Sequence, residues 1–208
     1  MRFTTSHPFD ANERLFAAMR DCESVCEWLH LPVQSGSNRI LRAMRRGYTA
    51  EAYLDKIGRL RRLIPDISLS TDIIVGFPGE TDEEFEQTLG LLREVEYDNA
   101  YIFKYSPRPG TDAAARPDDV SKDVKEARNQ EALALQDRIV LKRLQRFDAQ
   151  RLPVLFEFPG RLPGQIFGST RGNHGVIVNA PGEWIGRECD VRIDRIGSHT
   201  LFGSLSGV

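Results

Sequence analysis

Three short polar segments each follow a brief apolar run, and they hold most of the residue types that can bind a ligand. The first is HLPVQSGS, in which Gln34, Ser35 and Ser37 offer hydrogen-bonding groups and Gly36 lets the backbone approach a ligand closely. Such groups suit ribose hydroxyls or the amino-acid end of a ligand. An ordinary turn from strand to helix, with Ser37 as the N-cap, is the alternative interpretation of the same residues.

The second segment, STDIIVGFPGE, predicts a buried strand that ends in a tight turn. Gly76 removes a side chain where the strand ends, and the Pro-Gly pair before Glu80 favours the turn. Asp72 is unusual, because a carboxylate inside an apolar strand needs partners. It either joins a hydrogen-bond network or faces a polar interior, and we favour the second because functional sites collect such acids.

The third segment, FKYSPRPGT, combines cations with aromatic rings. Lys104 and Arg108 can hold phosphates, while Phe103 or Tyr105 can stack on a base, a combination typical of proteins that bind unpaired RNA. A solvated proline-rich loop is the alternative. Among the arginines on the preceding helices, Arg46 is the candidate to pair with a ligand carboxylate.

The elements that must position these segments alternate between short apolar runs and longer amphipathic stretches up to about residue 110. This pattern predicts an α/β fold with a parallel sheet, in which ligands gather at the carboxyl ends of the strands. The expected strands are residues 2–5, 28–32, 68–75 and 100–105, and the expected helices are residues 11–20, 37–45, 50–63 and 83–94.

Beyond Gly110 the sequence changes character twice. A polar connector leads into a long amphipathic helix at about residues 120–150, and then apolar residues alternate with period two in LPVLFEF, GQIFGST, GVIVNA, ECDVRIDRIG and TLFGSL. Five such strands predict a small antiparallel barrel. We therefore expect a first domain at residues 1–118, a connecting helix at 119–150 and a barrel at 151–208.

Composition limits what the barrel can bind. The whole chain has 208 residues and a net charge of −2, and the barrel has six arginines against five acidic residues, so any RNA contact must come from local patches. Arg161, Arg171 and His174, in loops between the strands, are the candidates. The alternative is a barrel that only packs against the first domain.

No apolar run is long enough to span a membrane and no secretory signal is present, which favours the cytoplasm.

Three cysteines are too few for a disulfide framework. Cys22 and Cys26 have a C-x3-C spacing like the start of an iron–sulfur motif, but Leu29 stands where a third ligand would fall. Since a cluster with one open iron needs three thiolates, we expect no metal site in this chain.

Taken in order, TTSHP, HLPVQSGSNRILRAMRRGYT, STDIIVGFPGETDEEFEQTL and FKYSPRPGT resemble the methylthiotransferases of the radical S-adenosylmethionine superfamily. The last part of the chain looks like the TRAM domain that ends these enzymes. The resemblance implies the C-terminal half of a radical SAM (β/α) partial barrel, followed by a small all-β, OB-like TRAM barrel. It covers essentially the whole chain.

By this resemblance the cofactors are S-adenosylmethionine, which is cleaved to a 5′-deoxyadenosyl radical, and two 4Fe-4S clusters in the full-length enzyme. Residues 34–37 and 76–80 should line the S-adenosylmethionine cleft, with Arg46 or Asp72 near its polar end, and residues 104–108 should face the nucleotide. Cys22 and Cys26 match no cluster ligand. The partner would be tRNA, with no DNA or membrane, and the full-length enzyme would be a monomer.

Within the family, the first and third segments look most like the branch that methylthiolates isopentenyladenosine beside the tRNA anticodon. The branches that act on threonylcarbamoyladenosine or on a ribosomal protein are alternatives, as is a non-catalytic RNA-binding module. Because the cluster motif is missing, we expect this chain alone to be inactive. A partial barrel also leaves a strand edge and apolar surface uncovered, which predicts poor solubility or self-association.

Overall fold

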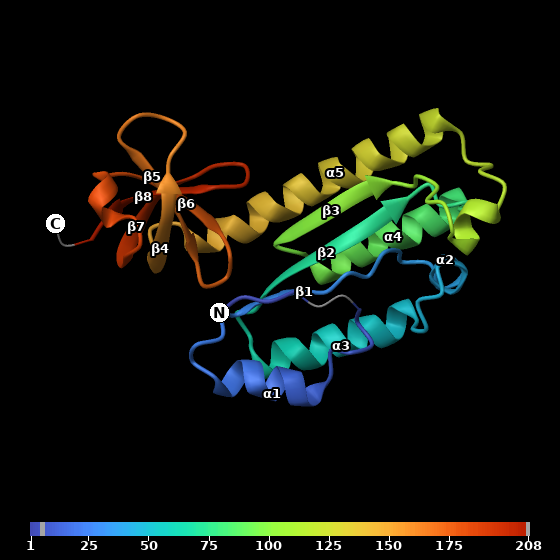
Figure 1. Cartoon of the computed structure of the whole chain (residues 1–208), viewed down its shortest axis with the longest axis horizontal. Coiled ribbons are helices and arrows are strands. Elements are labelled where there is room, and N and C mark those ends of the chain that lie inside the picture. Colours follow the sequence, from blue (N-terminus) through green and yellow to red (C-terminus); the bar gives the residue numbers. More distant parts are fainter. Residues whose placement is uncertain (5–6, 207–208) are drawn as a thin grey trace.

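The first part of the protein alternates helices and strands, as the periodicity predicts. The computed structural model describes residues 1–4 and 7–206. Within them β1, β2 and β3 form a parallel sheet in that order (Figure 1). The elements in chain order are α1 (Glu13–Asp21), β1 (Trp28–His30), α2 (Asn38–Ala43), α3 (Ala50–Leu63), β2 (Ser68–Val75), α4 (Asp82–Val95) and β3 (Asn99–Lys104). The predicted α/β class is confirmed.

The helices cover one face of this sheet. That face carries aliphatic side chains, among them Leu29, Ile73 and Ile102, which are buried in the first hydrophobic core. Helix α5 (Lys122–Leu144) packs on β3 and β2 and also against α4. The opposite face carries Trp28, His30, Asp72, Tyr101 and Phe103, and its rings and carboxylate remain partly exposed.

One expected strand, at residues 2–5, is wrong for the residues that the structure describes. Among residues 1–4, Thr4 makes an isolated parallel bridge to His30, and a turn follows at residues 8–10, in which the amide of Asp10 donates to the carbonyl of His7. Thr5 lies outside the described residues. The expected helix at 120–150 is shorter, because it tightens into a 3-10 turn at Gln145–Phe147 before the barrel begins.

The C-terminal part is a closed barrel with strand order β4-β5-β6-β8-β7. Its strands are β4 (Arg151–Pro159), β5 (Gln165–Thr170), β6 (Gly175–Asn179), β7 (Glu188–Ile196) and β8 (Leu201–Leu205). The predicted small barrel is confirmed, except that β6 and β8 pair in parallel. Helix α5 contributes to both cores: Ile139 packs in the first core, and Val140 and Leu144 pack in the core of the barrel.

The loop between β5 and β6 docks the barrel onto the amino ends of the sheet strands. Arg171 donates two hydrogen bonds to the carboxylate of Glu27, at 2.7 and 2.8 Å. The imidazole Nε2 of His174 lies 2.9 Å from the hydroxyl of Ser68. Gly172 lies close to Ser68 in this contact, and a side chain there would not fit, because a Cβ would lie 2.6 Å from the Ser68 Oγ.

A buried carboxylate, that of Asp98, lies at the centre of this contact. It accepts hydrogen bonds from the amide of Leu69 in β2 and from the guanidinium groups of Arg143 and Arg146. Its side chain is only 5% exposed, and His174 Nε2 is 3.8 Å away. Since buried charges require partners, the sheet, the end of α5 and the barrel share one network.

The loop at residues 35–37 packs against α4. Gly36 donates its amide to the hydroxyl of Thr88 at 3.0 Å, and Ser37 both caps α2 and donates to the carboxylate of Glu84 at 2.9 Å. Burial alone would raise the pKa of Glu84, but hydrogen bonds from Arg39, the Thr81 amide and Ser37 lower it to about 2. The loop is therefore held by an ionised carboxylate.

We predict that His174 makes the protein less stable in mild acid. Burial lowers the pKa of His174 to about 4, against an ordinary 6.5, although the carboxylate of Asp98 opposes the shift. Because the folded protein takes up the proton less readily than the unfolded chain, stability is full above pH 6.5 and falls as the pH drops towards 4. His174→Gln should remove this loss, so that the fall in the free energy of unfolding between pH 6.5 and pH 4, measured by urea denaturation, is smaller by up to about 3 kcal/mol.

His199→Gln is the matched control for this experiment, since the side chain of His199 is 52% exposed and contacts Asp137 of α5 and not the buried Asp98 network. It should keep the slope of the unsubstituted protein. An unchanged slope in His174→Gln between pH 6.5 and 4.5 would contradict the assignment.

We also predict opposite effects of two Gly→Ala substitutions. A Cβ at Gly36 would collide with the backbone carbonyl of Gln87, whereas a Cβ at Gly90, inside α4, would meet nothing within 4 Å. Gly36→Ala should lower the free energy of unfolding by about 1–3 kcal/mol through overpacking. Gly90→Ala should raise it by about 0.5–1 kcal/mol through helix propensity. Urea denaturation measures both, and equal effects would rule out the close packing of this loop.

Candidate functional site

The carboxyl ends of the strands border a cleft of about 780 Å³, a size typical of small-molecule sites. It brings together predicted residues from all three polar segments. These are Gln34, Asp72, Phe103, Lys104, Tyr105 and Arg108, and Arg46 joins them from the segment after α2. Sequence reasoning missed the apolar part of the wall, which includes Met44, Ile74 and Phe77. Phe77 lies inside the GFPGE segment, so its position next to Gly76 could have identified it as a lining residue.

Gln34 is held against β2 in a strained conformation. Its amide donates to the carbonyl of Asp72 and its carbonyl accepts from the amide of Ile74, both at 2.9 Å. Its φ of 73° lies in the left-handed region, and the residue is buried. A non-glycine residue in this region costs free energy, and such strain tends to persist at functional sites.

Asp72 lies on the partly exposed face of β2 and lines the cleft. Its carboxylate is 3.5 Å from Nε2 of His30 on the neighbouring strand. Arg46 borders the same cleft from the segment after α2. A carboxylate that accepts hydrogen bonds and a guanidinium that binds anions therefore share one cavity.

Gly76 and Glu80 shape the cleft from behind and do not line it. The carboxylate of Glu80 is buried and accepts from the amide of Gly76 at 2.7 Å and from the guanidinium of Arg128 at 2.9 Å. Burial raises the pKa of Glu80, while the Gly76 amide and Arg128 oppose the shift. Gly76 has a φ of 68°, and a Cβ there would collide with the side chain of Lys125. The pair Glu80–Arg128 thus fixes the turn that follows β2.

Residues 35–37 also lie away from this cleft. Gly36 and Ser37 border a second cavity of about 470 Å³, formed with Arg39, Glu51 and Glu84. Ser35 is buried, and its hydroxyl accepts from the amide of Ser37. The structure thus assigns Ser37 the N-cap position that was the alternative interpretation of this segment.

The third segment supplies the outer wall of the cleft. Phe103 is exposed, Lys104 forms an ion pair with Glu126, and Arg108 follows in the loop. The hydroxyl of Tyr105 is buried and has no hydrogen-bond partner within the described part of the chain. Its ring meets Phe77 edge-on and lies under the ammonium group of Lys125.

The three barrel candidates are not brought together. Arg161 is exposed in the loop between β4 and β5, whereas Arg171 and His174 are engaged in the domain contact. Contact with RNA stays a prediction for all three.

Among residues 1–4 and 7–206 there is no group of three His, Cys, Asp or Glu side chains that can hold a metal ion. In the same residues, no helix combines the length and apolarity needed to cross a membrane.

Comparison with known families assigns both parts of the chain. The family described as the Radical SAM superfamily matches residues 1–92, and the TRAM domain matches residues 145–206. Among solved structures, the coproporphyrinogen III oxidase HemN from Escherichia coli, described as a radical SAM enzyme, superposes with a TM-score of 0.57. The superposition covers 97% of this chain and 50% of HemN at 16% identity, so it supports the fold alone.

Curated relatives match the entire chain. It is 46% identical, over 100% of its length, to the tRNA-2-methylthio-N(6)-dimethylallyladenosine synthase of Methylacidiphilum infernorum, and 48% identical, over 99%, to that of Acetivibrio thermocellus. The chain spans 45% and 43% of those two proteins, less than half of each. The predicted resemblance is thus confirmed: the chain joins a radical SAM segment to a TRAM domain and is similar throughout to the C-terminal part of the tRNA-2-methylthio-N(6)-dimethylallyladenosine synthases.

Proposed function

We propose that this chain forms the cofactor-facing and RNA-facing part of a tRNA methylthiotransferase. The reaction is conversion of N6-isopentenyladenosine beside the anticodon to its 2-methylthio derivative. The observation that carries the proposal is the cleft in which Gln34, Asp72 and Lys104 meet, since they come from three successive strands or the loops that follow them. The names of the relatives support the choice of nucleoside.

The cleft fits S-adenosylmethionine in size and chemistry. Asp72 and Gln34 suit the ribose hydroxyls, Arg46 suits the carboxylate, and the apolar wall at Ile74 and Phe77 suits the adenine ring. The unpartnered hydroxyl of Tyr105 supports an additional polar group at this site. When bound and reduced, the cofactor supplies a 5′-deoxyadenosyl radical. The residues named here bind and orient it.

The two 4Fe-4S clusters do not fit the described residues, which offer no suitable group of ligands. Under this proposal both clusters have their ligands elsewhere in the whole enzyme, and the chain by itself has no turnover. For RNA, the proposal keeps Phe103, Lys104, Arg108 and the exposed Arg161. It sets aside Arg171 and His174, whose side chains are used in the domain contact. A cytoplasmic location, a monomeric whole enzyme and the absence of DNA or membrane partners remain expectations of the same proposal.

Deletion of the gene that encodes this chain tests the proposal. Mass spectrometry of tRNA nucleosides from the deletion strain should show loss of the 2-methylthio group from isopentenyladenosine, while unmodified isopentenyladenosine accumulates. Loss of the group from threonylcarbamoyladenosine would identify the neighbouring branch. Intact tRNA combined with an altered ribosomal protein would identify the third branch, and no change in either would leave the non-catalytic RNA-binding module.

A further inference from the structure

Lys125 is buried near the start of α5, behind the wall of the cleft. Only 8% of its side chain is exposed, whereas lysine side chains are seldom buried unless they are paired. Its contacts come from the turn after β2 and from both ends of the loop between β3 and α5. The burial of this cation therefore needs an explanation beyond the packing of a helix.

The loop between β3 and α5 forms one wall of the cleft. We call its residues 106–117 the strap. Strap residues that line the cleft include Arg108, Thr111, Asp112 and Ala113. None of residues 106–117 is buried. Because a segment with few buried contacts opens readily, the packing of the strap itself does not fix its place beside the cleft.

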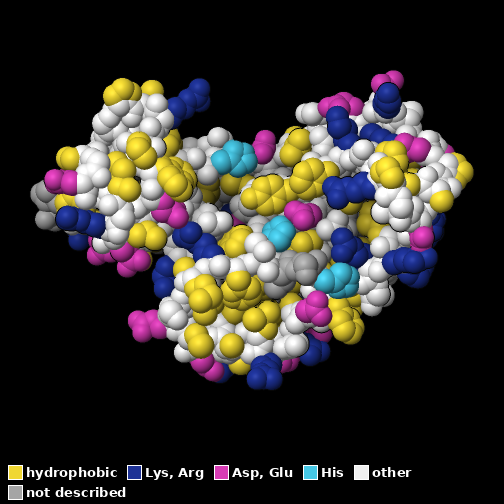
Figure 2. Space-filling model, viewed as in Figure 1, with side chains coloured by type: hydrophobic (Ala, Val, Ile, Leu, Met, Phe, Trp, Pro, Cys, Tyr) yellow, Lys and Arg dark blue, Asp and Glu magenta, His cyan; other side chains and the backbone are white. Residues whose placement is uncertain are grey.

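The tip of the strap is held only weakly. Asp112 forms an ion pair with Arg45, but the two side chains are 55% and 80% exposed. Figure 2 shows basic and acidic side chains interspersed over this end of the molecule. Since water and salt screen exposed pairs, this contact contributes little to the position of the strap.

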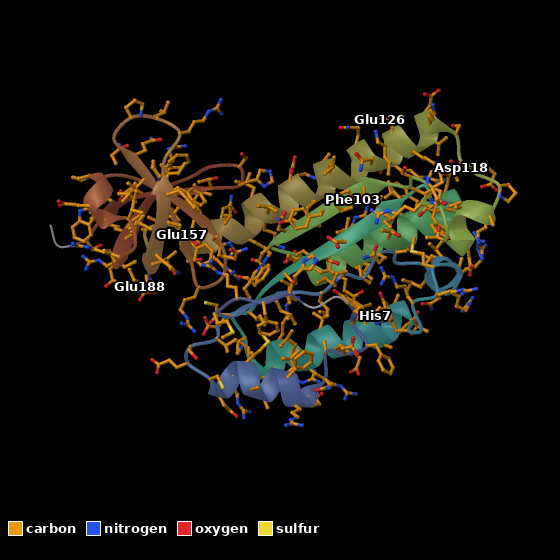
Figure 3. The ribbon with its side chains drawn as sticks, viewed as in Figure 1. His7, Phe103, Asp118, Glu126, Glu157 and Glu188 are labelled. Atoms are coloured by element: carbon orange, nitrogen blue, oxygen red, sulfur yellow. The ribbon has the colours of Figure 1, made fainter. Side chains whose placement is uncertain are left out.

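Lys125 contacts the residues on both sides of the strap. Its ammonium group donates to the two carboxylate oxygens of Asp118, at 2.6 and 2.7 Å, and lies 5.2 Å from the centre of the Tyr105 ring. Tyr105 precedes the strap and Asp118 follows it, so one cation closes the base of the loop. Figure 3 labels Asp118 close to the amino end of α5.

The stem of Lys125 connects this base to the turn after β2. A Cβ at Gly76 would lie 2.3 Å from Cγ of Lys125, so the stem packs directly against the glycine. Nearby, Asp119 accepts from the amide of Gly79 at 2.6 Å. The strap and the turn after β2 are therefore held together at one place.

We propose that Lys125 is a positioning residue of the cleft, which closes the base of the strap and holds it against the turn after β2. Lys125 does not line the cleft, so it acts through Tyr105 and Asp118 and not by contact with a ligand. A long apolar stem that ends in a cation suits both of its environments. The inference rests on the proposed function only for the identity of the ligand.

Amide hydrogen exchange of the full chain, followed residue by residue by NMR, tests this role. Lys125→Met keeps most of the apolar stem and removes the charge. The amides of Tyr105 and Gly79, which bond to Val75 and Asp119 at the two ends of the strap, should then exchange about 10-fold faster. Lys125→Arg keeps a cation that can pair with a carboxylate and should stay within about 2-fold of the original rates.

Lys122→Met is the matched control, because Lys122 lies on the same helix and is exposed. It should leave both rates unchanged. If Lys125→Met does not fold, Asp118→Asn replaces it and should also accelerate exchange at both amides. Unchanged exchange at Tyr105 and Gly79 would overturn the inference. An equal rise throughout the chain, the barrel included, would also overturn it, because Lys125 would then support only the fold as a whole.

Complementation of the deletion strain separates this inference from the proposed function. A gene with Lys125→Met should restore less of the 2-methylthio nucleoside than a gene with Lys125→Arg, and full restoration by both would overturn the positioning role. Faster exchange at Tyr105 and Gly79, in a protein whose deletion leaves the nucleosides unchanged, would retain the role of Lys125 and reject the methylthiotransferase.

Discussion

The arrangement of the whole molecule depends on one buried carboxylate, that of Asp98. It accepts from the Leu69 amide in β2, from Arg143 at the end of α5 and from Arg146 in the 3-10 turn that follows, so it neutralises charges that would otherwise be buried alone. His174 and Ser68 complete the contact from the barrel and the sheet. Because this network lies at the amino ends of the strands, the TRAM barrel is fixed there and the carboxyl ends are left for a ligand.

At the carboxyl ends of the strands a second buried ion pair, Glu80–Arg128, supports the wall of the cleft but does not line it. Arg128 of α5 holds Glu80, and Glu80 in turn holds the amide of Gly76 where β2 ends. The same helix therefore fixes the turn beside the cleft through Arg128 and the loop before β3 through Arg143. Asp72 and Gln34, which line the cleft, are positioned instead by backbone hydrogen bonds between Gln34 and β2.

The sequence pattern located most elements, because periodicity reports which residues face a core. The strand at 68–75 and the helix at 50–63 have the predicted bounds. Pattern alone could not tell which loop residues face the cleft: Ser35 and Gly36 follow a strand as Gln34 does, yet they pack on α4. It also could not foresee that Arg171 and His174, in an apparently solvated loop, would dock on Glu27 and Ser68. Such pairings join residues more than a hundred positions apart.

The length of α5 has a geometric consequence. Its 23 residues span about 35 Å, and Ile139 and Val140, adjacent in sequence, pack into different cores. Inserting one residue between them would turn one core by about 100° relative to the other, so the helix tolerates neither lengthening nor shortening. The separation and relative rotation of the barrel and the cleft are therefore set by the number of residues in α5, and any ligand that contacted both would have to bridge that fixed span.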